Sequence, residues 1–538
     1  MTPGRDPAAR RAADRWPEKG MQMEAIVPLL VVLPLGAAFA IVVLASLPTR
    51  REPGGSVPLG QRAALPLAAI IVAANLAISV RLLGGDVGPM FIGGWSPGKT
   101  LGIQMICDGL SKLMAVTINL VALASIIFAK AYMRRFTKVW LFSSLFLLMT
   151  AAMNAVVLAG DLFNLFVFLE VAAIASYALV AFGCEAEELE AAFKYLVLGT
   201  VGSAFILLGV AILYSLTGQL NMAMVASLLP KAGSSAVLLA AAALIAGLAL
   251  KAAMVPFHAW LPDAHPSAPA PISAMLSGVL IKASGVYALA RVVFNVFGPT
   301  GAYATVLMVL GAVSMVVGVF LAVGQWDFKR LLAYHSISQM GYVVLALGAA
   351  AAVLARGGER AVAGLCLFGG LFHLFNHAAF KSLLFLSSGS IEQQTGTRQL
   401  KEMGGLSRRM PVTSFCCRVG ALSIAGVPPF NGFFSKLIII IGLTLAGYPL
   451  LAALAVLVAL MTLLSFIKVQ RYALEGPPQG SIAAVTEAPA SMGIALALLA
   501  IVCIAGGLAM GPLREHLFAP AGEILLNGRF ALGTGVLP

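Results

Sequence analysis

Long apolar runs separated by short polar loops recur along nearly the whole chain. A bilayer core about 30 Å thick takes about 20 helical residues to cross. Because only helices satisfy their own backbone groups across such a run, the pattern predicts an all-α polytopic membrane protein of about fourteen transmembrane helices. The predicted spans lie at about 24–46, 63–83, 111–129, 139–159, 162–182, 195–216, 235–256, 271–295, 301–324, 331–353, 361–389, 412–445, 448–470 and 489–512.

Two of these spans are interrupted. The run at 412–445 is too long for one straight crossing and contains GVPPFNG at 426–432, whose prolines lack amide donors and whose glycines loosen the helix. The span that carries Lys251 is cut at Val255–Pro256. We therefore expect a broken helix at each place.

An internal repeat relates the two interruptions. The segment AAFKYLVL at 191–198 recurs as AAFKSLLF at 378–385. The segment MVPFHAW at 254–260 corresponds to GVPPFNGFF at 426–434. The copies correspond to the fourth to eighth and the ninth to thirteenth helices. Five is an odd number, so the two five-helix copies insert with opposite orientation. Transporters place ion sites in the broken helices of such inverted repeats, which predicts two half-channels.

The repeat also divides the chain into segments. The first twenty-odd residues, rich in Arg, Ala and Pro, are either a disordered arm or precede the natural start at Met21 or Met23. The predicted segments are an N-terminal arm at 1–23, helices one to three at 24–130, the first repeat at 131–300, the second, inverted repeat at 301–475, and a loop with the last helix at 476–538.

Composition agrees with a membrane protein and limits the function classes. Hydrophobic residues make up 60% of the chain and charged residues 11%, with a mean hydropathy of +0.96. The net charge of +13 comes from short basic clusters between apolar runs, so we expect no nucleic-acid partner. One set of alternate loops carries nearly twice as many Lys and Arg as the other. The positive-inside rule then predicts a multi-pass bacterial inner-membrane (plasma-membrane) protein with both termini on the periplasmic side.

The sequence offers little for a metal or cofactor. The six cysteines show no CxxC spacing and lie in or beside apolar segments, which favours reduced, buried thiols over a metal or iron–sulfur site. No flavin, nicotinamide or haem motif is present. Any redox chemistry would therefore belong to a partner chain.

Charged residues inside the spans carry the functional signal. Glu170 lies in the middle of DLFNLFVFLEVAAIASYAL, Lys251 precedes the first break, and Lys282 lies deep in ISAMLSGVLIKASGVYAL. A charge in lipid costs a few kcal/mol, so such residues face partners or water and mark ion pathways. A proton relay through these groups is one reading. A purely structural Glu–Lys ion pair is the other.

The second copy carries a further set of ionisable residues. His373, His377 and Lys381 follow one another at a spacing of four, which places them on one helical face, and imidazoles pass protons near neutral pH. Two histidines four apart also suit a metal, but no third ligand stands at a suitable spacing. Lys436 follows the second break and is a candidate for the terminal proton donor.

Three accessory candidates have ordinary alternatives. His335 either extends the relay or is a satisfied histidine at the membrane interface. His258, with Asp263 and His265, either forms a polar mouth or caps a re-entrant turn. Lys194 follows the acidic stretch CEAEELEA and either pairs with one of its glutamates or lines a channel, as its match to Lys381 suggests.

The chain resembles the antiporter-like subunits shared by respiratory complex I, energy-converting membrane hydrogenases and multisubunit Na⁺/H⁺ antiporters. The resemblance covers nearly everything after residue 24. It rests on five stretches, DLFNLFVFLE, KAAMVPFHAWLPDAHPSAPAPISAMLSGVLIK, QWDFKRLLAYHSISQMGY, HLFNHAAFKSLLF and GVPPFNGFFSK. Within the family, the first stretch and the lysine at 436 are most similar to the antiporter's D-type component and its hydrogenase and complex I counterparts. The histidine at 335 supports the same assignment.

The resemblance implies a fourteen-helix fold with broken seventh and twelfth helices and a hydrophilic axis parallel to the membrane. By family pattern, Glu170 and Lys251 would form a coupling pair and Lys282 a bridge. The helix with His373, His377 and Lys381 would be the link, and Lys436 would be the terminal proton donor.

Three functions follow as hypotheses. The first is a proton-translocating subunit of a larger complex, either a complex I-like NADH:quinone oxidoreductase or a membrane hydrogenase. The second is the D-type component of a multisubunit monovalent cation/H⁺ antiporter, moving Na⁺ or K⁺ against protons without a redox partner. A non-conducting scaffold is the third, and the full set of buried ionisable residues disfavours it. In each case other membrane subunits and the lipid bilayer are the expected partners.

Overall fold

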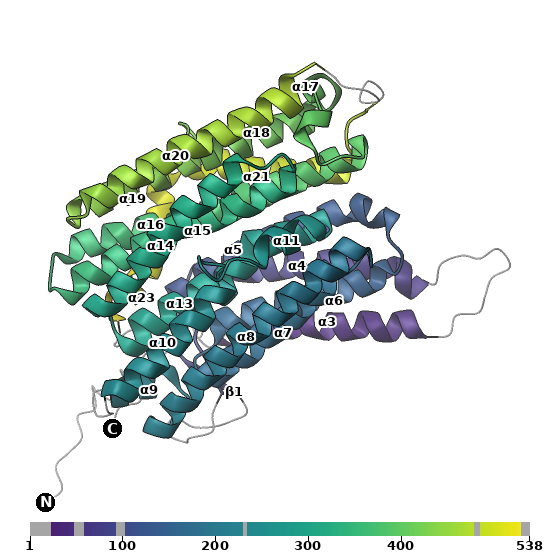
Figure 1. Cartoon of the computed structure of the whole chain (residues 1–538). Coiled ribbons are helices and arrows are strands. Elements are labelled where there is room, and N and C mark those ends of the chain that lie inside the picture. The colour runs from purple at the N-terminus through teal and green to yellow at the C-terminus, as the bar shows by residue number, and fades with distance from the viewer. Residues whose placement is uncertain (1–22, 48–58, 93–102, 230–233, 478–484, 529–538) are drawn as a thin grey trace, which may run out of the picture.

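A computed structural model of the chain describes residues 23–47, 59–92, 103–229, 234–477 and 485–528. Figure 1 shows a bundle of long helices whose axes run roughly parallel. Helices of the N-terminal half (purple to teal) lie on one side and those of the C-terminal half (green to yellow) on the other. The predicted arm at 1–23 lies outside the described residues, except for its last residue.

The first half of the chain forms helices and two short strands. Their bounds are α3 Leu29–Ser46, α4 Leu59–Leu82, β1 Met90–Ile92, β2 Ile103–Met105, α5 Gly109–Tyr132, η1 Met133–Arg135, α6 Val139–Leu158, α7 Leu162–Val180, α8 Ala186–Thr217, α9 Met222–Leu228, α10 Ser234–Lys251, α11 Leu261–Ser267, α12 Ala270–Met275, η3 Leu276–Tyr287, α13 Ala288–Ala290 and η4 Arg291–Phe297.

The described residues of the second half form helices joined by short loops. The bounds are α14 Gly301–Val323, α15 Phe328–Ala355, α16 Arg360–Thr395, η5 Leu400–Glu402, α17 Leu406–Arg409, α18 Pro411–Ala425, α19 Asn431–Leu445, α20 Pro449–Val469, η6 Gln470–Glu475, α21 Ala490–Leu508, α22 Met510–Leu513, η8 Arg514–Phe518 and α23 Ala519–Leu526.

Twelve helices in the described part of the chain are long and apolar enough to cross a membrane, and each overlaps one of the predicted spans. Three shorter apolar helices, α10, α18 and α19, occupy the two remaining predicted spans. Large apolar side chains such as Leu450, Leu508 and Phe193 are exposed on the outside, whereas many polar side chains are buried inside. This distribution is the one expected where lipid is the surrounding solvent.

Both interruptions occur at the predicted places. α10 ends at Lys251, and the chain turns before α11 begins at Leu261. The indole Nε1 of Trp260 donates to the carbonyl of Leu250 at 3.1 Å, so one of the acceptors freed by the break is satisfied. α18 ends at Ala425, where Gly426 adopts φ +82°, a conformation that glycine tolerates best.

Two features differ from the prediction. β1 and β2 pair antiparallel, so the described chain is not purely helical. Strands of three residues in a loop are too short to show a period in the sequence. In addition, the helix that carries Lys282 is π-helical over η3 and η4, with about one residue more per turn than an α-helix. Hydropathy does not distinguish these two helix types.

We predict that Gly311→Ala destabilises the contact between α14 and α15. A Cβ at Gly311 would lie 2.5 Å from the backbone N of Leu345, so the two helices would have to separate. Overpacking of this kind costs about 1–3 kcal/mol, and thermal unfolding of the detergent-solubilised protein should reveal it. Gly301→Ala, on the same helix with nothing within 4 Å, is the control. Equal melting temperatures for the two variants would contradict the tight packing.

Candidate ion-translocation site

A buried ion pair lies beside the first broken helix. The Lys251 ammonium at the end of α10 is 3.2 Å from the Glu170 carboxylate on α7. The hydroxyl of Ser203 on α8 donates to the same carboxylate oxygen. Lys251 is 5% exposed and Glu170 27% exposed, so this chain covers the ammonium almost completely and leaves part of the carboxylate uncovered. The contact joins the two residues that the family resemblance implies as a pair.

Aromatic rings enclose the ammonium side of this pair. Trp260 stacks on Tyr195 with ring centroids 4.2 Å apart and an interplanar angle of 8°. A cavity of about 10 Å³, roughly the volume that one water needs, is lined by Lys251, both rings, Leu280 and Ser284 among others. Because the last two residues lie on η3, the cavity links the ion pair to the helix that carries Lys282.

Lys282 is fully buried at the centre of the bundle. Its ammonium donates to the carbonyl of Ser277, five residues earlier on η3, at 2.6 Å. The hydroxyl of Ser277 in turn lies 2.7 Å from that of Ser336 on α15. Short polar contacts therefore lead from Lys282 toward the second half of the protein.

The linking helix α16 places its three predicted residues inside the bundle. His373, His377 and Lys381 are all fully buried. Nδ1 of His373 lies 2.9 Å from the hydroxyl of Ser435 on α19. Both ring nitrogens of His377 and the ammonium of Lys381 have no hydrogen-bond partner among the described residues. In a folded protein, buried polar groups of this kind need a polar partner or water.

Lys436 reaches back from α19 to the second break. Its ammonium donates to the carbonyl of Ile424 at 2.6 Å and lies 5.1 Å from the ring centroid of Tyr342. Because α18 ends one residue after Ile424, the helix break supplies the acceptor. The residue is 3% exposed. Six of the seven principal candidates are thus buried inside the protein, and Glu170 is partly covered.

The three accessory candidates differ in their surroundings. His335 is fully buried, 5.0 Å from the ring of Phe466, and neither ring nitrogen has a partner among the described residues. The ring therefore packs inside the bundle, and the two interpretations of His335 both stay predictions. Lys194 is 46% exposed and pairs with Glu190 at 2.7 Å, as its ordinary alternative predicts.

The residues grouped with His258 do not form one exposed mouth. Asp263 pairs with Lys194 at 3.0 Å and with Arg330 at 3.1 Å. His265 is fully buried, with its ring centroid 5.8 Å from that of Trp260. His258 itself is partly exposed, and its Nδ1 has no partner among the described residues.

Sequence reasoning missed two buried cations by counting them as loop charges. Lys329 is 2% exposed and pairs with Glu392 at 2.8 Å. Arg291 is also 2% exposed and pairs with Asp108 at 2.5 Å. They come from opposite sets of loops, so removing both leaves the charge asymmetry in place. The signal that could have found them is that both lie within helices, Lys329 as the second residue of α15 and Arg291 six residues before the end of the helical stretch 270–297.

The matching family model is "NADH:quinone oxidoreductase/Mrp antiporter, TM", which covers residues 159–462. The chain belongs to this family. It is 36% identical to the N-type subunit of the NADH-quinone oxidoreductase of Desulforudis audaxviator over 89% of this chain and 95% of that protein. It is 33% identical to the D-type component of the Na⁺/H⁺ antiporter of Alkalihalophilus pseudofirmus over 85% of this chain and 90% of that protein.

A solved structure shows the same architecture. A chain of the Mrp complex from Dietzia sp. DQ12-45-1b superposes with a TM-score of 0.83 at 29% identity, covering 94% of this chain and 98% of that one. The predicted resemblance is therefore confirmed. The protein is an antiporter-like membrane subunit of the kind found in complex I, Mrp antiporter and hydrogenase complexes.

The six cysteines provide a test of the side-chain placement. Five are buried and Cys184 is exposed, which corrects the expectation that all of them are buried. Maleimide should label Cys184 at least about tenfold faster than the others in the detergent-solubilised protein. Mass spectrometry of the labelled peptides measures this, and Cys184→Ser should remove the fast phase. Fast labelling of Cys417 or Cys107 would contradict the packing.

Proposed function

We propose that this chain translocates protons as a subunit of a larger membrane complex, either a complex I-like NADH:quinone oxidoreductase or a membrane hydrogenase. One observation carries the proposal. The Glu170–Lys251 pair, Lys282, the α16 residues and Lys436 form a series of ionisable groups inside a lipid-embedded bundle. Such groups are costly in a membrane and mark ion pathways.

A second candidate function is that of the D-type component of a multisubunit monovalent cation/H⁺ antiporter. The 33% identity to such a component of a Na⁺/H⁺ antiporter and the TM-score of 0.83 to a chain of an Mrp complex support it. In this case protons would be exchanged for Na⁺ or K⁺ without a redox partner. In both cases the catalytic or driving machinery lies on other subunits, and this chain supplies the ion path.

For the architecture, we propose fourteen crossings. α10 would complete one crossing with its break, and α18 with α19 another. Helices four to eight at 131–300 and nine to thirteen at 301–475 would be the inverted repeats, after helices one to three at 24–130 and before the last helix within 476–538. The positive-inside rule supports both termini on the periplasmic side of a bacterial inner membrane.

The mechanism we propose is electrostatic. A driving event elsewhere in the complex separates Glu170 from Lys251, and the unbalanced ammonium then repels a proton from Lys282 toward α16 and Lys436. Moving one charge against 100 mV takes about 2.3 kcal/mol. A change of pairing worth one to two pKa units supplies about 1.4 kcal/mol for each unit, so the two energies match in size.

Glu170→Gln tests the role of the pair. The variant keeps the size of the side chain and a hydrogen-bond acceptor for Ser203, but it removes the charge that balances Lys251. We expect proton transport by the reconstituted native complex to fall at least about tenfold, a change of about 1.4 kcal/mol in the barrier. A pH-sensitive dye inside the liposomes measures the rate.

Glu190→Gln is the matched control, because it makes the same chemical change at an exposed position on α8. It should leave transport within about twofold of wild type. Undiminished transport in Glu170→Gln, with normal assembly, would remove the basis of the proposal.

The parent complex decides between the two candidate functions. If this chain belongs to a redox complex, its affinity purification in mild detergent should recover partners that carry flavin or iron–sulfur centres. Recovery of small membrane proteins alone, without such centres, would instead establish the antiporter function. Mass spectrometry and the visible absorption spectrum of the purified complex provide both readouts.

A further inference from the structure

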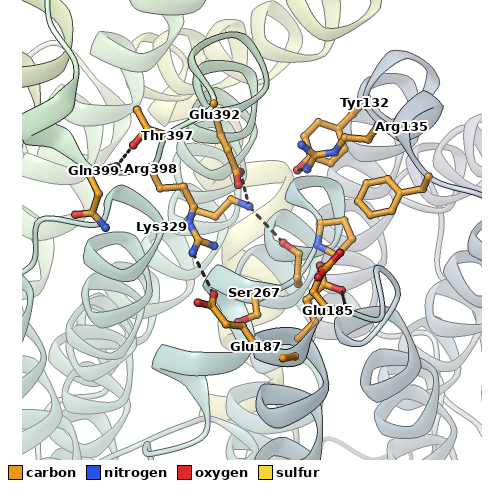
Figure 2. A pocket seen from close by; sticks show the side chains of 16 residues that line it. Tyr132, Arg135, Glu185, Glu187, Ser267, Lys329, Glu392, Thr397, Arg398 and Gln399 are labelled. Carbon is orange, nitrogen blue, oxygen red and sulfur yellow. Dashed lines mark hydrogen bonds and ion pairs between the residues drawn. The ribbon is translucent and has the colours of Figure 1, made fainter. Parts of the chain in front are cut away.

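A large polar pocket opens at the end of the bundle whose loops carry more Lys and Arg residues than those of the other end. Figure 2 shows it from close by, with Lys329 and Glu392 side by side and the side chains of Arg135 and Arg398 nearby. Its volume is about 590 Å³, and its wall includes Glu185, Glu187 and Glu188 of the segment that opens α8. The proton path described above does not include this pocket.

The floor of the pocket is a buried ion pair. Lys329 is 2% exposed and lies 2.8 Å from Glu392, which is 20% exposed. The Lys329 ammonium is also 3.4 Å from the carbonyl of Ala268, which precedes α12. Glu392 therefore touches pocket water, whereas Lys329 is on the inner side of the pair. Arg398 and Arg135 are the other charges that act on Glu392.

The pair joins the three elements that carry the inner relay. Lys329 is on α15, about 9 Å along the helix from His335. Glu392 is on α16, about 16 Å from Lys381 by the same measure. Ala268 lies between His265 and the helix of Lys282, and the charges of both Lys282 and Lys381 act on the His265 ring. The ion pair thus lies between the pocket and the helices that carry the buried histidines and lysines.

The lining favours water and protons over a larger ligand. Both acidic and basic side chains line the wall, and several are already paired, as Arg398 is with Asp327 at 3.2 Å and with Glu187 at 3.5 Å. An anion or an organic cation would have to break these pairs on binding. A hydronium ion needs only one carboxylate that water can reach.

We propose that this pocket is the proton inlet of the protein and that the Glu392–Lys329 pair is its gate, an inference that rests on the proposed function. A hydronium ion in the pocket transfers a proton to the Glu392 carboxylate and leaves behind one water molecule. The new O–H bond neutralises Glu392 and weakens its hold on Lys329. The same proton then leaves Glu392 on inner water toward His265 and the central lysines, and the carboxylate and the ion pair are restored.

Side-specific blocking of the pocket tests the inlet. Ser267 lies in the pocket wall, and Ser267→Cys in a Cys184→Ser background gives a thiol there. The membrane-impermeant reagent sulfonatoethyl methanethiosulfonate is added to everted and to right-side-out vesicles that contain the native complex. We expect proton transport to fall at least tenfold in everted vesicles only, and dithiothreitol to restore it.

Ser46→Cys in the same background is the matched control, because it presents an exposed thiol at the end of α3, where the loop charges predict the same side of the membrane. Modification of this thiol should leave transport unchanged. If modified Ser267→Cys transports normally while Glu170→Gln does not, the inlet is wrong and the proposed function stands. If Glu170→Gln also transports normally, the proposed function itself fails.

A double variant separates a gate from a structural ion pair. Lys329→Met combined with Glu392→Met replaces the pair by apolar side chains of similar size, which often leaves stability unchanged. If the pair only holds the helices together, this variant assembles and transports protons, which would overturn the gate. If Glu392 takes up protons, the variant assembles but transport falls at least tenfold, as it also does in Glu392→Gln.

Discussion

The interior of a lipid-embedded bundle tolerates ionisable groups only when each has a partner or water. This constraint explains the geometry around Glu170 and Lys251. Breaking α10 directly after Lys251 places the ammonium at a helix end, within 3.2 Å of the carboxylate that Ser203 also holds. The helix end and the ion pair thus coincide at Lys251, and the mechanism proposed above depends on this pair.

The two breaks satisfy their free carbonyls in different ways. At the first, the indole N–H of Trp260 donates a hydrogen bond to the Leu250 carbonyl, and the Lys251 ammonium pairs with Glu170. At the second, the Lys436 ammonium donates a hydrogen bond to the Ile424 carbonyl and lies over the ring of Tyr342. The first break thus holds a balanced ion pair and the second a lysine with neutral partners. Such asymmetry suits a first half that receives the driving event and a second half that releases protons.

The sequence predicts the helices and their breaks well because long apolar runs and prolines act locally. It also identifies the ionisable residues that lie at mid-span, such as Glu170 and Lys282. It fails for Lys329 and Arg291, because hydropathy near a helix end does not reveal whether a cation turns outward to water or inward to Glu392 or Asp108. The depth at which His335 lies, and the π-helical form of η3, depend on packing between segments far apart in the chain.

The central claim is that buried water connects the ionisable groups into one path. A cryo-electron microscopy map of the native complex, at a resolution that shows ordered water, tests it most directly. The account predicts waters at hydrogen-bond spacing, about 2.8 Å, from Lys251 past Lys282 and His377 to Lys436. A dry apolar gap along this route, too long for one water to bridge in any state of the complex, would contradict the account.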